Sequence, residues 1–106
     1  MCGIGGVIGD YNKEEIYYFL NNLYLRGPDN KSTIFNEKYG CAFTRLSIID
    51  QKNGNQPFHN TKKNAFIFVN GEIYNSSELS NSLQQANFKI KTKSDIEPLI
   101  YLYQKE

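Results

Sequence analysis

The sequence predicts an α+β domain whose strands and helices follow one another in the order β-α-β-β-β-α-α. Two observations predict this class. Apolar residues recur at helical spacing in three segments, and short β-rich apolar runs bounded by turn residues separate those segments. With 106 residues, of which 40% are hydrophobic and 22% charged, the chain has the size and composition of one globular domain.

The first half of the chain predicts a strand, a helix and two further strands. Residues 3–9 alternate small and branched side chains, which is typical of a buried strand. From Lys13 to Leu25 the apolar residues fall at helical spacing, and Asn12 is placed to cap that helix. Arg26-Gly27-Pro28-Asp29 then ends the helix in a loop. The next strands are expected over 32–36 and 39–49, followed by a polar loop over 50–60.

The second half predicts one more strand and two helices. Ala65 to Val69 is a continuous apolar run that predicts a buried strand. Asn70-Gly71 follows it and suits a tight turn with positive φ. Ser76 or Ser77 can cap a helix, whose inner face is expected to be Leu79, Leu83 and Ala86. Ser94 to Glu97 has the spacing of a capping box and should open the last helix.

Charge and hydropathy exclude several classes of protein. The net charge of +1 gives no basis for binding nucleic acid or an anionic membrane. No apolar run approaches the roughly 18 residues of a transmembrane helix, and the N-terminus lacks a secretory signal. Cys2 and Cys41 do not make a disulfide framework, and a free thiol suits a reducing compartment. We therefore expect a cytoplasmic protein. Because Glu106 arrives while the last helix pattern is still amphipathic, we also expect a truncated chain.

The start Met1-Cys2-Gly3 carries the clearest chemical signal. Removal of Met1 would leave a cysteine with a thiol nucleophile and a free α-amine on one residue. An α-amine has a reference pKa of about 7.7–8.0, so part of it is neutral near pH 7 and can accept a proton. Cys2 is therefore a candidate catalytic residue, although a second-position cysteine alone is more often incidental.

Three further segments supply the groups that attack on an amide requires. The tetrahedral oxyanion needs N–H donors; Asn70 offers a side-chain amide and Gly71 a backbone N–H open to close approach. Arg45 can hold an α-carboxylate through two parallel hydrogen bonds, and Glu72 or Asp95 can hold an α-ammonium. Each alone has a commoner structural interpretation, such as an ion pair, a hairpin turn or a helix-terminal charge. Their order behind the leading cysteine indicates a site for an amino acid with a side-chain amide.

These motifs resemble the class II, N-terminal-nucleophile glutamine amidotransferases, and within them the asparagine synthetase branch. The resemblance extends from Cys2 to the end of the chain. It is carried by Arg26-Gly27-Pro28-Asp29, Arg45-Leu46-Ser47-Ile48-Ile49-Asp50 with Gln56-Pro57, Asn70-Gly71-Glu72 and Ser94-Asp95. It implies the N-terminal-nucleophile hydrolase fold, an αββα sandwich. Residues 1–106 would be the N-terminal portion of a glutaminase domain.

The resemblance also implies a role for each matching residue. Cys2 would be the nucleophile, Asn70 and Gly71 the oxyanion hole, and Arg26 the organiser of the loop around the nucleophile. The substrate-binding residues would be Arg45, Leu46, Ile48, Glu72 and Asp95. The implied reaction is hydrolysis of L-glutamine to glutamate and ammonia through a Cys2 thioester, with no metal or organic cofactor in this domain.

The implied partner is a synthetase domain or subunit that uses ATP and Mg²⁺ and accepts the ammonia. Because a partial sandwich leaves apolar faces uncovered, homodimerisation or strand exchange is expected to cover them. Leu25 and Phe43 stand where family members often carry histidine, and we expect altered packing or tuning there and no loss of the chemistry. The alternative hypothesis is a non-catalytic fragment or interaction module that retains the site residues.

Overall fold

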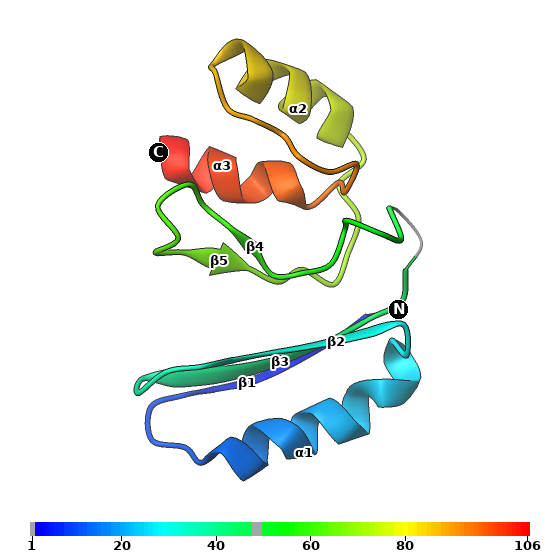
Figure 1. Cartoon of the computed structure of the whole chain (residues 1–106), viewed down its shortest axis with the longest axis vertical. Helices are drawn as coiled ribbons and strands as arrows, with labels where there is room; N and C mark the ends of the chain where they lie inside the picture. The colour runs from blue at the N-terminus through cyan, green and yellow to red at the C-terminus, as the bar shows by residue number, and fades with distance from the viewer. Residues whose placement is uncertain (1, 48–49) are drawn as a thin grey trace. The chain divides into compact units, whose positions relative to one another are not determined.

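The computed structural model describes residues 2–47 and 50–106, which belong to two compact units, residues 1–47 and 48–106. Both units combine β-strands with helices (Figure 1). The mixed α/β character predicted from the sequence is therefore confirmed.

The first unit is built on a three-stranded antiparallel sheet with strand order β1-β3-β2. The strands are β1 (Gly3–Ile8), β2 (Asn30–Phe35) and β3 (Tyr39–Arg45). The register pairs Gly3 with Thr44 across β1 and β3, and Asn30 with Arg45 across β2 and β3. The first residues of β1 and β2 therefore pair with the last residues of β3, at one end of the strands. Cys2 directly precedes β1 and lies at this same end of the sheet.

One helix, α1 (Lys13–Leu23), covers one face of this sheet (Figure 1). Asn12 caps it as predicted. The Asn12 Oδ1 accepts the Glu15 amide at 3.1 Å, and Glu15 Oε2 accepts the Asn12 amide at 2.9 Å. This reciprocal pair is a capping box, which satisfies donors that the helix itself leaves open. The helix ends before Leu25, because residues Tyr24–Arg26 tighten into a 3₁₀ turn, η1.

The helix and sheet approach closely at Gly40. A Cβ there would lie 2.6 Å from Tyr11 Cε2 and 2.8 Å from Ile16 Cγ1. Ile16 is fully buried in this contact layer. Any side chain larger than hydrogen at residue 40 would therefore push α1 away from β3.

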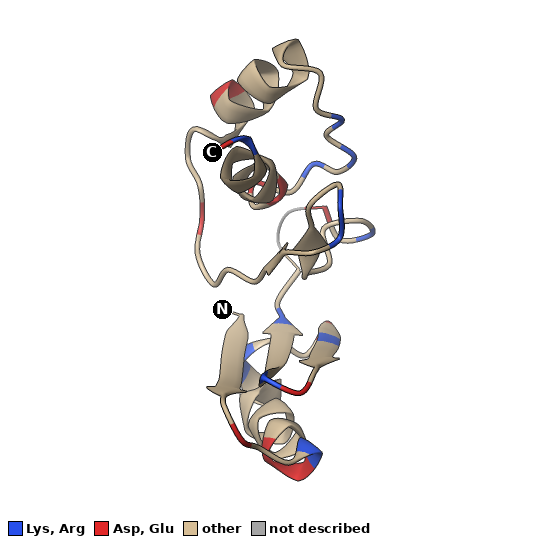
Figure 2. Cartoon of the chain, turned by 90° about the vertical axis from the view of Figure 1, so that its left-hand side faces the viewer, with Lys and Arg blue, Asp and Glu red and all other residues tan. Residues whose placement is uncertain are grey.

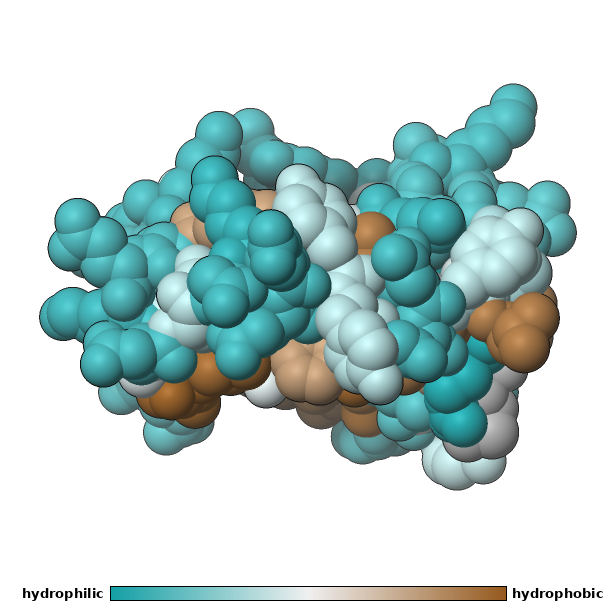
Figure 3. All heavy atoms as spheres, turned by 90° about the horizontal axis from the view of Figure 1, so that it is seen from below, coloured by the Kyte–Doolittle hydropathy of each residue, from teal (hydrophilic) through white to brown (hydrophobic). Residues whose placement is uncertain are grey.

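The prediction that residues 3–9 form a buried strand is only half right. Successive side chains of a strand point to opposite faces, and α1 covers one face of this sheet. Ile8 is 93% exposed and Ile4 44% exposed. Viewed from the α1 side, the surface is mainly hydrophilic with scattered apolar residues (Figure 3). Tyr17 and Tyr18 of α1 also remain substantially exposed.

The second unit pairs a short hairpin with two helices. Strands β4 (Phe58–His59) and β5 (Phe66–Ile67) are antiparallel, and the helices are α2 (Ser76–Gln85) and α3 (Glu97–Lys105). Figure 1 shows α3 lying over the hairpin and α2 beyond α3. The core is formed by Phe58, Leu83, Ile96, Ile100 and Tyr101. The strand expected over 65–69 is thus only two residues long. The polar loop expected over 50–60 includes strand β4, in which His59 is exposed and its ring contacts Phe66.

The helix starts of this unit differ from the sequence-based expectation. Asn75 precedes α2 without a side-chain cap, so neither Ser76 nor Ser77 caps that helix, and Ala86 is exposed. The capping box expected from Ser94 and Glu97 is also wrong, because the residue before α3 is Ile96 and it makes no side-chain cap.

Glu97 instead holds the segment that precedes its helix. The side chain is 2% exposed, and its carboxylate accepts the Lys91 amide at 2.9 Å and the Thr92 amide at 2.7 Å. The Thr92 hydroxyl donates to the same carboxylate at 2.6 Å. This segment, which joins α2 to α3, carries three lysines, Lys89, Lys91 and Lys93 (Figure 2). The buried Glu97 carboxylate therefore fixes the backbone of this segment, while its three lysine residues are exposed.

Replacing Gly40 with alanine should lower the free energy of unfolding by about 1–3 kcal/mol, because the new methyl group overpacks the α1–β3 contact. Urea denaturation followed by circular dichroism measures the effect. Gly71→Ala is the matched control for stability, since a Cβ there meets only Val69 Cγ1 at 3.7 Å. Equal stability of the two variants would contradict the close approach.

Stability should also fall at alkaline pH through Tyr101. Burial, and then the negative charge and hydrogen bond of Glu97, raise the pKa of Tyr101 above its ordinary value. The resulting stabilisation is complete below about pH 10, the ordinary value, and is lost as the pH rises through the higher folded-state pKa. Tyr101→Phe should therefore flatten the decline in urea midpoint above pH 10, whereas Tyr103→Phe, at an exposed tyrosine of the same helix, should keep the wild-type slope.

Candidate functional site

Cys2 is contacted by Leu46, directly after β3, and by Arg26, the last residue of η1. Cys2 is half-buried, and its Sγ lies 4.0 Å from the carbonyl oxygen of Leu46, to which the thiol donates weakly. The Arg26 Nε donates to the Cys2 carbonyl oxygen at 3.2 Å. Arg26 is otherwise exposed, so its guanidinium links the surface loop to the backbone of the candidate nucleophile.

The loop that follows η1, residues 27–29, is bonded to the end of β3. The Asp29 amide donates to the Arg45 carbonyl oxygen at 2.9 Å, and the Ser47 amide donates to Asp29 Oδ2 at 2.6 Å. Pro28 forms an isolated parallel bridge with Arg45. The loop is therefore bonded to the backbone of β3 at the end of the sheet where Cys2 lies.

Gly27 allows this close approach. It is buried, and a Cβ at this residue would lie 2.5 Å from the Arg45 carbonyl carbon and 2.6 Å from the Arg45 nitrogen. Contacts this short are with backbone atoms that cannot rotate away. Only glycine lets the loop pack directly on the backbone of β3 at this point.

The first unit thus brings together four of the residues predicted for the site: Cys2, Arg26, Arg45 and Leu46. Arg45 is 5% exposed, so its guanidinium is held within the protein and is not a surface cation. The second cysteine, Cys41, is half-buried in β3, and burial raises the pKa of its thiol. A raised pKa leaves less thiolate near neutral pH, which argues against Cys41 as a nucleophile.

In the second unit, Asn70, Gly71 and Glu72 form an exposed bend between β5 and α2. The positive φ expected for Asn70-Gly71 is not observed, and no strand follows to complete a hairpin. The physical reason is that the chain here does not turn back on β5 but continues into a turn that leads to α2. The bend exposes a side-chain amide, a backbone N–H without a neighbouring Cβ, and a carboxylate.

Side chains hold this bend at both ends. On the preceding side, Gln56 Oε1 accepts the Val69 amide at 2.6 Å and Gln56 Nε2 donates to the Val69 carbonyl oxygen at 3.1 Å. On the following side, Asp95 Oδ2 accepts the Ile73 amide at 2.7 Å. Asp95 is half-buried, and this bond places its carboxylate next to the bend.

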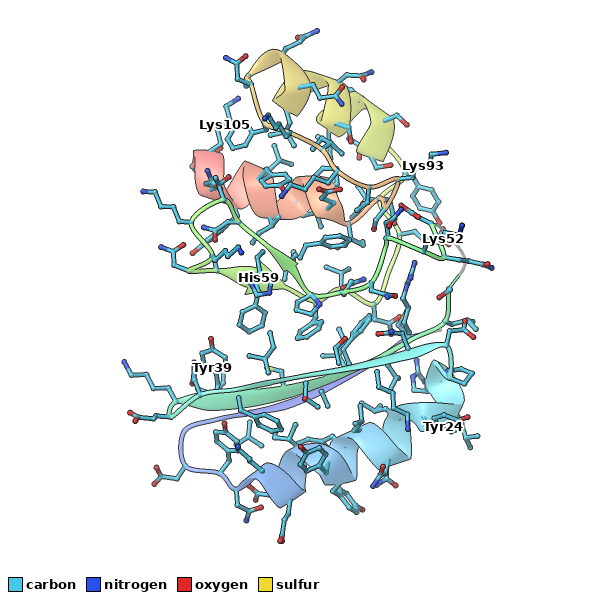
Figure 4. The ribbon with its side chains drawn as sticks, in the orientation of Figure 1. Tyr24, Tyr39, Lys52, His59, Lys93 and Lys105 are labelled. Carbon is cyan, nitrogen blue, oxygen red and sulfur yellow. The ribbon has the colours of Figure 1, made fainter. Side chains whose placement is uncertain are left out.

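The position of Asp95 is itself fixed by its neighbours. Asp50 has φ of 47°, and its Oδ2 accepts the Lys93 amide at 2.8 Å. Figure 4 shows Lys52 and Lys93 in the same corner of the unit, where the loop after residue 50 meets the segment before α3. With Glu97 holding residues 91 and 92, the backbone leading to Asp95 is anchored at three successive residues.

The predicted site residues therefore fall into two described groups, one in each unit. The second contains Asn70, Gly71, Glu72 and Asp95, while Ile48 lies outside the described residues. Sequence reasoning assigned no role to Gln56 or Asp50, and it gave Glu97 only a capping role at the start of the last helix. All three stood within or beside the recognised motifs, so their position was a signal, but their hydrogen bonds go to backbone amides that a sequence pattern does not specify.

A cavity of about 830 Å³ in the second unit is separate from this bend. It is lined by residues between 53 and 63 and between 86 and 104, and residues 69–73 do not line it. Several of its polar groups are engaged internally: Asn60 Oδ1 accepts the amides of Asn64 and Ala65, and Glu97 is bonded as described. The chemistry offered by the bend therefore does not depend on this cavity.

The described part of the chain contains neither a metal-type side-chain cluster nor a helix that could span a membrane. Within 2–47 and 50–106, His, Cys, Asp and Glu do not gather in threes that could hold a metal ion. In the same ranges, none of the helices has the length and apolar character needed to cross a membrane.

The chain is similar to several glutamine-hydrolyzing asparagine synthetases. It is 40% identical over 113 residues to asparagine synthetase 2 of Bacillus subtilis, covering 100% of this chain and 15% of the relative. Asparagine synthetase 1 of the same organism is 37% identical over 110 residues, covering 97% and 17%. Asparagine synthetase 1 of Arabidopsis thaliana is 37% identical over 109 residues, covering 98% and 18%. The chain thus spans less than a fifth of the length of these relatives.

A family model described as a glutamine amidotransferase domain matches residues 1–106, the whole of the sequence. Together with relatives of this identity, the match establishes the family that the motifs around Cys2 indicated. The chain belongs to the glutamine amidotransferase domain family.

Proposed function

We propose that this chain is the glutaminase portion of an asparagine synthetase-like glutamine amidotransferase, with Cys2 as its nucleophile. The observation that carries the proposal is the attachment of the loop 26–29 both to the Cys2 carbonyl and to the end of β3. This attachment orients Cys2 beside Arg45 and Leu46. Family membership and the glutamine-hydrolyzing activity in the names of the relatives support the same assignment.

The reaction begins with attack of the Cys2 sulfur on the side-chain carbonyl carbon of L-glutamine. The new C–S bond converts the carbonyl oxygen into an oxyanion, and the α-amine of Cys2 takes the thiol proton. The amine returns that proton to the leaving nitrogen as the C–N bond breaks, which releases ammonia and leaves a thioester. Water then adds to the thioester carbon, the C–S bond breaks, and glutamate leaves with the free thiol regenerated.

The remaining roles follow from the chemistry of each group. Asn70 and Gly71 donate N–H groups to the oxyanion, where preorganised donors act on developing charge. The Arg45 guanidinium binds the α-carboxylate. Glu72 and Asp95 bind the α-ammonium, with Leu46 and Ile48 lining the pocket.

The proposal includes the setting of the domain. The complete domain has the N-terminal-nucleophile αββα sandwich, and residues 1–106 are its first portion. The glutaminase reaction needs no metal or organic cofactor, since thiol, amine and N–H donors suffice. A synthetase domain or subunit that uses ATP and Mg²⁺ accepts the ammonia, and the protein works in the cytoplasm, where its thiol stays reduced. A homodimer covers apolar surface that this portion leaves open.

Cys2→Ala should abolish release of glutamate from L-glutamine, because the alanine side chain cannot form the thioester. A coupled glutamate assay on the purified chain, with loss of Met1 verified by mass spectrometry, measures this. Cys41→Ser is the matched control and should retain activity, since Cys41 lies in β3 away from the loop that holds Cys2. Activity that survives in Cys2→Ala would refute the proposal, and a folded but inactive wild type would favour the non-catalytic module. A chain that retains Met1 should be inactive, because its α-amine no longer belongs to Cys2.

Asn70→Ala should lower kcat by about 10²–10³-fold, the usual effect of removing one oxyanion donor, with a small change in KM. Steady-state kinetics with L-glutamine separates the two constants. The control is Asn75→Ala, at an exposed asparagine five residues further on that makes no side-chain cap with α2. An Asn70→Ala variant with wild-type kcat would remove Asn70 from the oxyanion hole.

A further inference from the structure

We propose that Gln56 is a positioning residue for catalysis: its side-chain amide fixes the backbone from which the two oxyanion donors, Asn70 and Gly71, project. The inference rests on the proposed function of that bend. It adds a residue to the machinery that contacts neither substrate nor nucleophile and acts only through the backbone.

The geometry is a two-point clamp on a single residue. Gln56 Oε1 accepts the Val69 N–H at 2.6 Å, and Gln56 Nε2 donates to the Val69 C=O at 3.1 Å. Strand β5 ends at Ile67, so Val69 lies beyond the hairpin pairing. The glutamine amide therefore gives Val69 the pair of hydrogen bonds that a neighbouring strand would otherwise provide.

Burial makes this clamp difficult to replace by water. Gln56 is 6% exposed and Val69 is half-buried. A buried donor or acceptor that loses its partner pays the full desolvation penalty, whereas an exposed one rebinds solvent. The orientation of the Val69 peptide is thus tied to the orientation of the Gln56 amide.

The clamp acts on the residue next to the donors. Val69 directly precedes Asn70, and the other anchor of the bend is the Ile73 amide on Asp95. Only residues 70–72 lie between the two anchored residues, so the bend has little room to shift while both hold. Loss of the Gln56 anchor frees the side of the bend that carries Asn70 and Gly71, while the Asp95 anchor stays in place.

This position predicts a particular kinetic signature. Oxyanion donors act on charge that develops in the transition state, so displacement of Asn70 and Gly71 lowers kcat. Glu72, which binds the α-ammonium in the proposed function, is next to Ile73, and Asp95 still holds Ile73. Ground-state binding of glutamine therefore changes less than kcat. Geometric errors of about 1 Å in catalytic groups are enough to cost about 10²-fold in rate. A residue that only stabilised the fold would not produce this separation between kcat and KM.

The test is the near-isosteric variant Gln56→Glu, assayed at pH 9 with the full chain lacking Met1. The ionised carboxylate still accepts the Val69 N–H, but its second oxygen faces the Val69 carbonyl oxygen and repels it. We expect kcat for L-glutamine to fall by about 10- to 100-fold while KM changes less than about threefold. Gln56→Met, which matches the glutamine in length and removes both bonds at any pH, should give the same pattern. Gln84→Glu, the same substitution at an exposed position in α2, is the control and should keep wild-type constants.

A second readout uses alkylation of Cys2 by iodoacetamide in a Cys41→Ser background. This displacement of iodide by the thiolate develops no oxyanion, so its rate should be unchanged in Gln56→Glu and Gln56→Met. An unchanged alkylation rate together with a lower kcat supports the positioning role. A kcat within about twofold of wild type, or a parallel loss of alkylation and hydrolysis, would overturn it. A wild type without Cys2-dependent hydrolysis would instead overturn the proposed function, and this inference with it.

Discussion

The candidate site of the first unit depends on one contact, the packing of Gly27 on the backbone of Arg45. This contact allows the Asp29 amide to reach the Arg45 carbonyl and the Ser47 amide to reach the Asp29 carboxylate. It also brings Arg26 to the carbonyl oxygen of Cys2. The register of β1 on β3 independently places residue 2 at the same end of the sheet. Two constraints, one from the loop and one from the sheet, therefore meet at the leading cysteine.

The second unit reaches a comparable order by a different route. Its hairpin is only two residues long on each side, so regular pairing cannot fix the bend that follows. Polar side chains do so instead. Gln56, which is buried, bonds Val69, and the half-buried Asp95 bonds Ile73. The buried Glu97 and the half-buried Asp50 hold the backbone that leads to Asp95. In such a network each group must find its partner, because an unsatisfied buried amide or carboxylate is costly. Side-chain hydrogen bonds to the residues on either side of the bend, Val69 and Ile73, thus hold the bend in position.

The sequence predicted what depends on local chemistry and spacing. The mixed α/β class, the helix after Asn12 with its cap, and the motif cluster behind Cys2 could all be inferred, because each depends on residues close together in the chain. The family followed from the order of those motifs. Expectations were wrong where tertiary contacts overrode a local pattern. Ser94 and Glu97 have capping-box spacing, yet the Glu97 carboxylate is drawn to the amides of Lys91 and Thr92. Asn70-Gly71 is a dipeptide typical of hairpin turns, yet the chain continues toward α2. The sequence of residues 3–9 predicts a buried strand, yet Ile8 is exposed on the edge strand β1.

A side chain that bonds to another residue's main chain makes no demand on the identity of that residue. Gln56 contacts the peptide of Val69, Asp95 that of Ile73, and Asp29 that of Ser47. Any amino acid except proline could supply the same N–H at these receiving positions. The residue that supplies the backbone group can therefore be substituted in evolution while the residue that supplies the side chain is kept. The two positions need not vary together among related sequences. Methods that infer proximity from correlated substitutions would overlook these pairs, although they hold the candidate site in place.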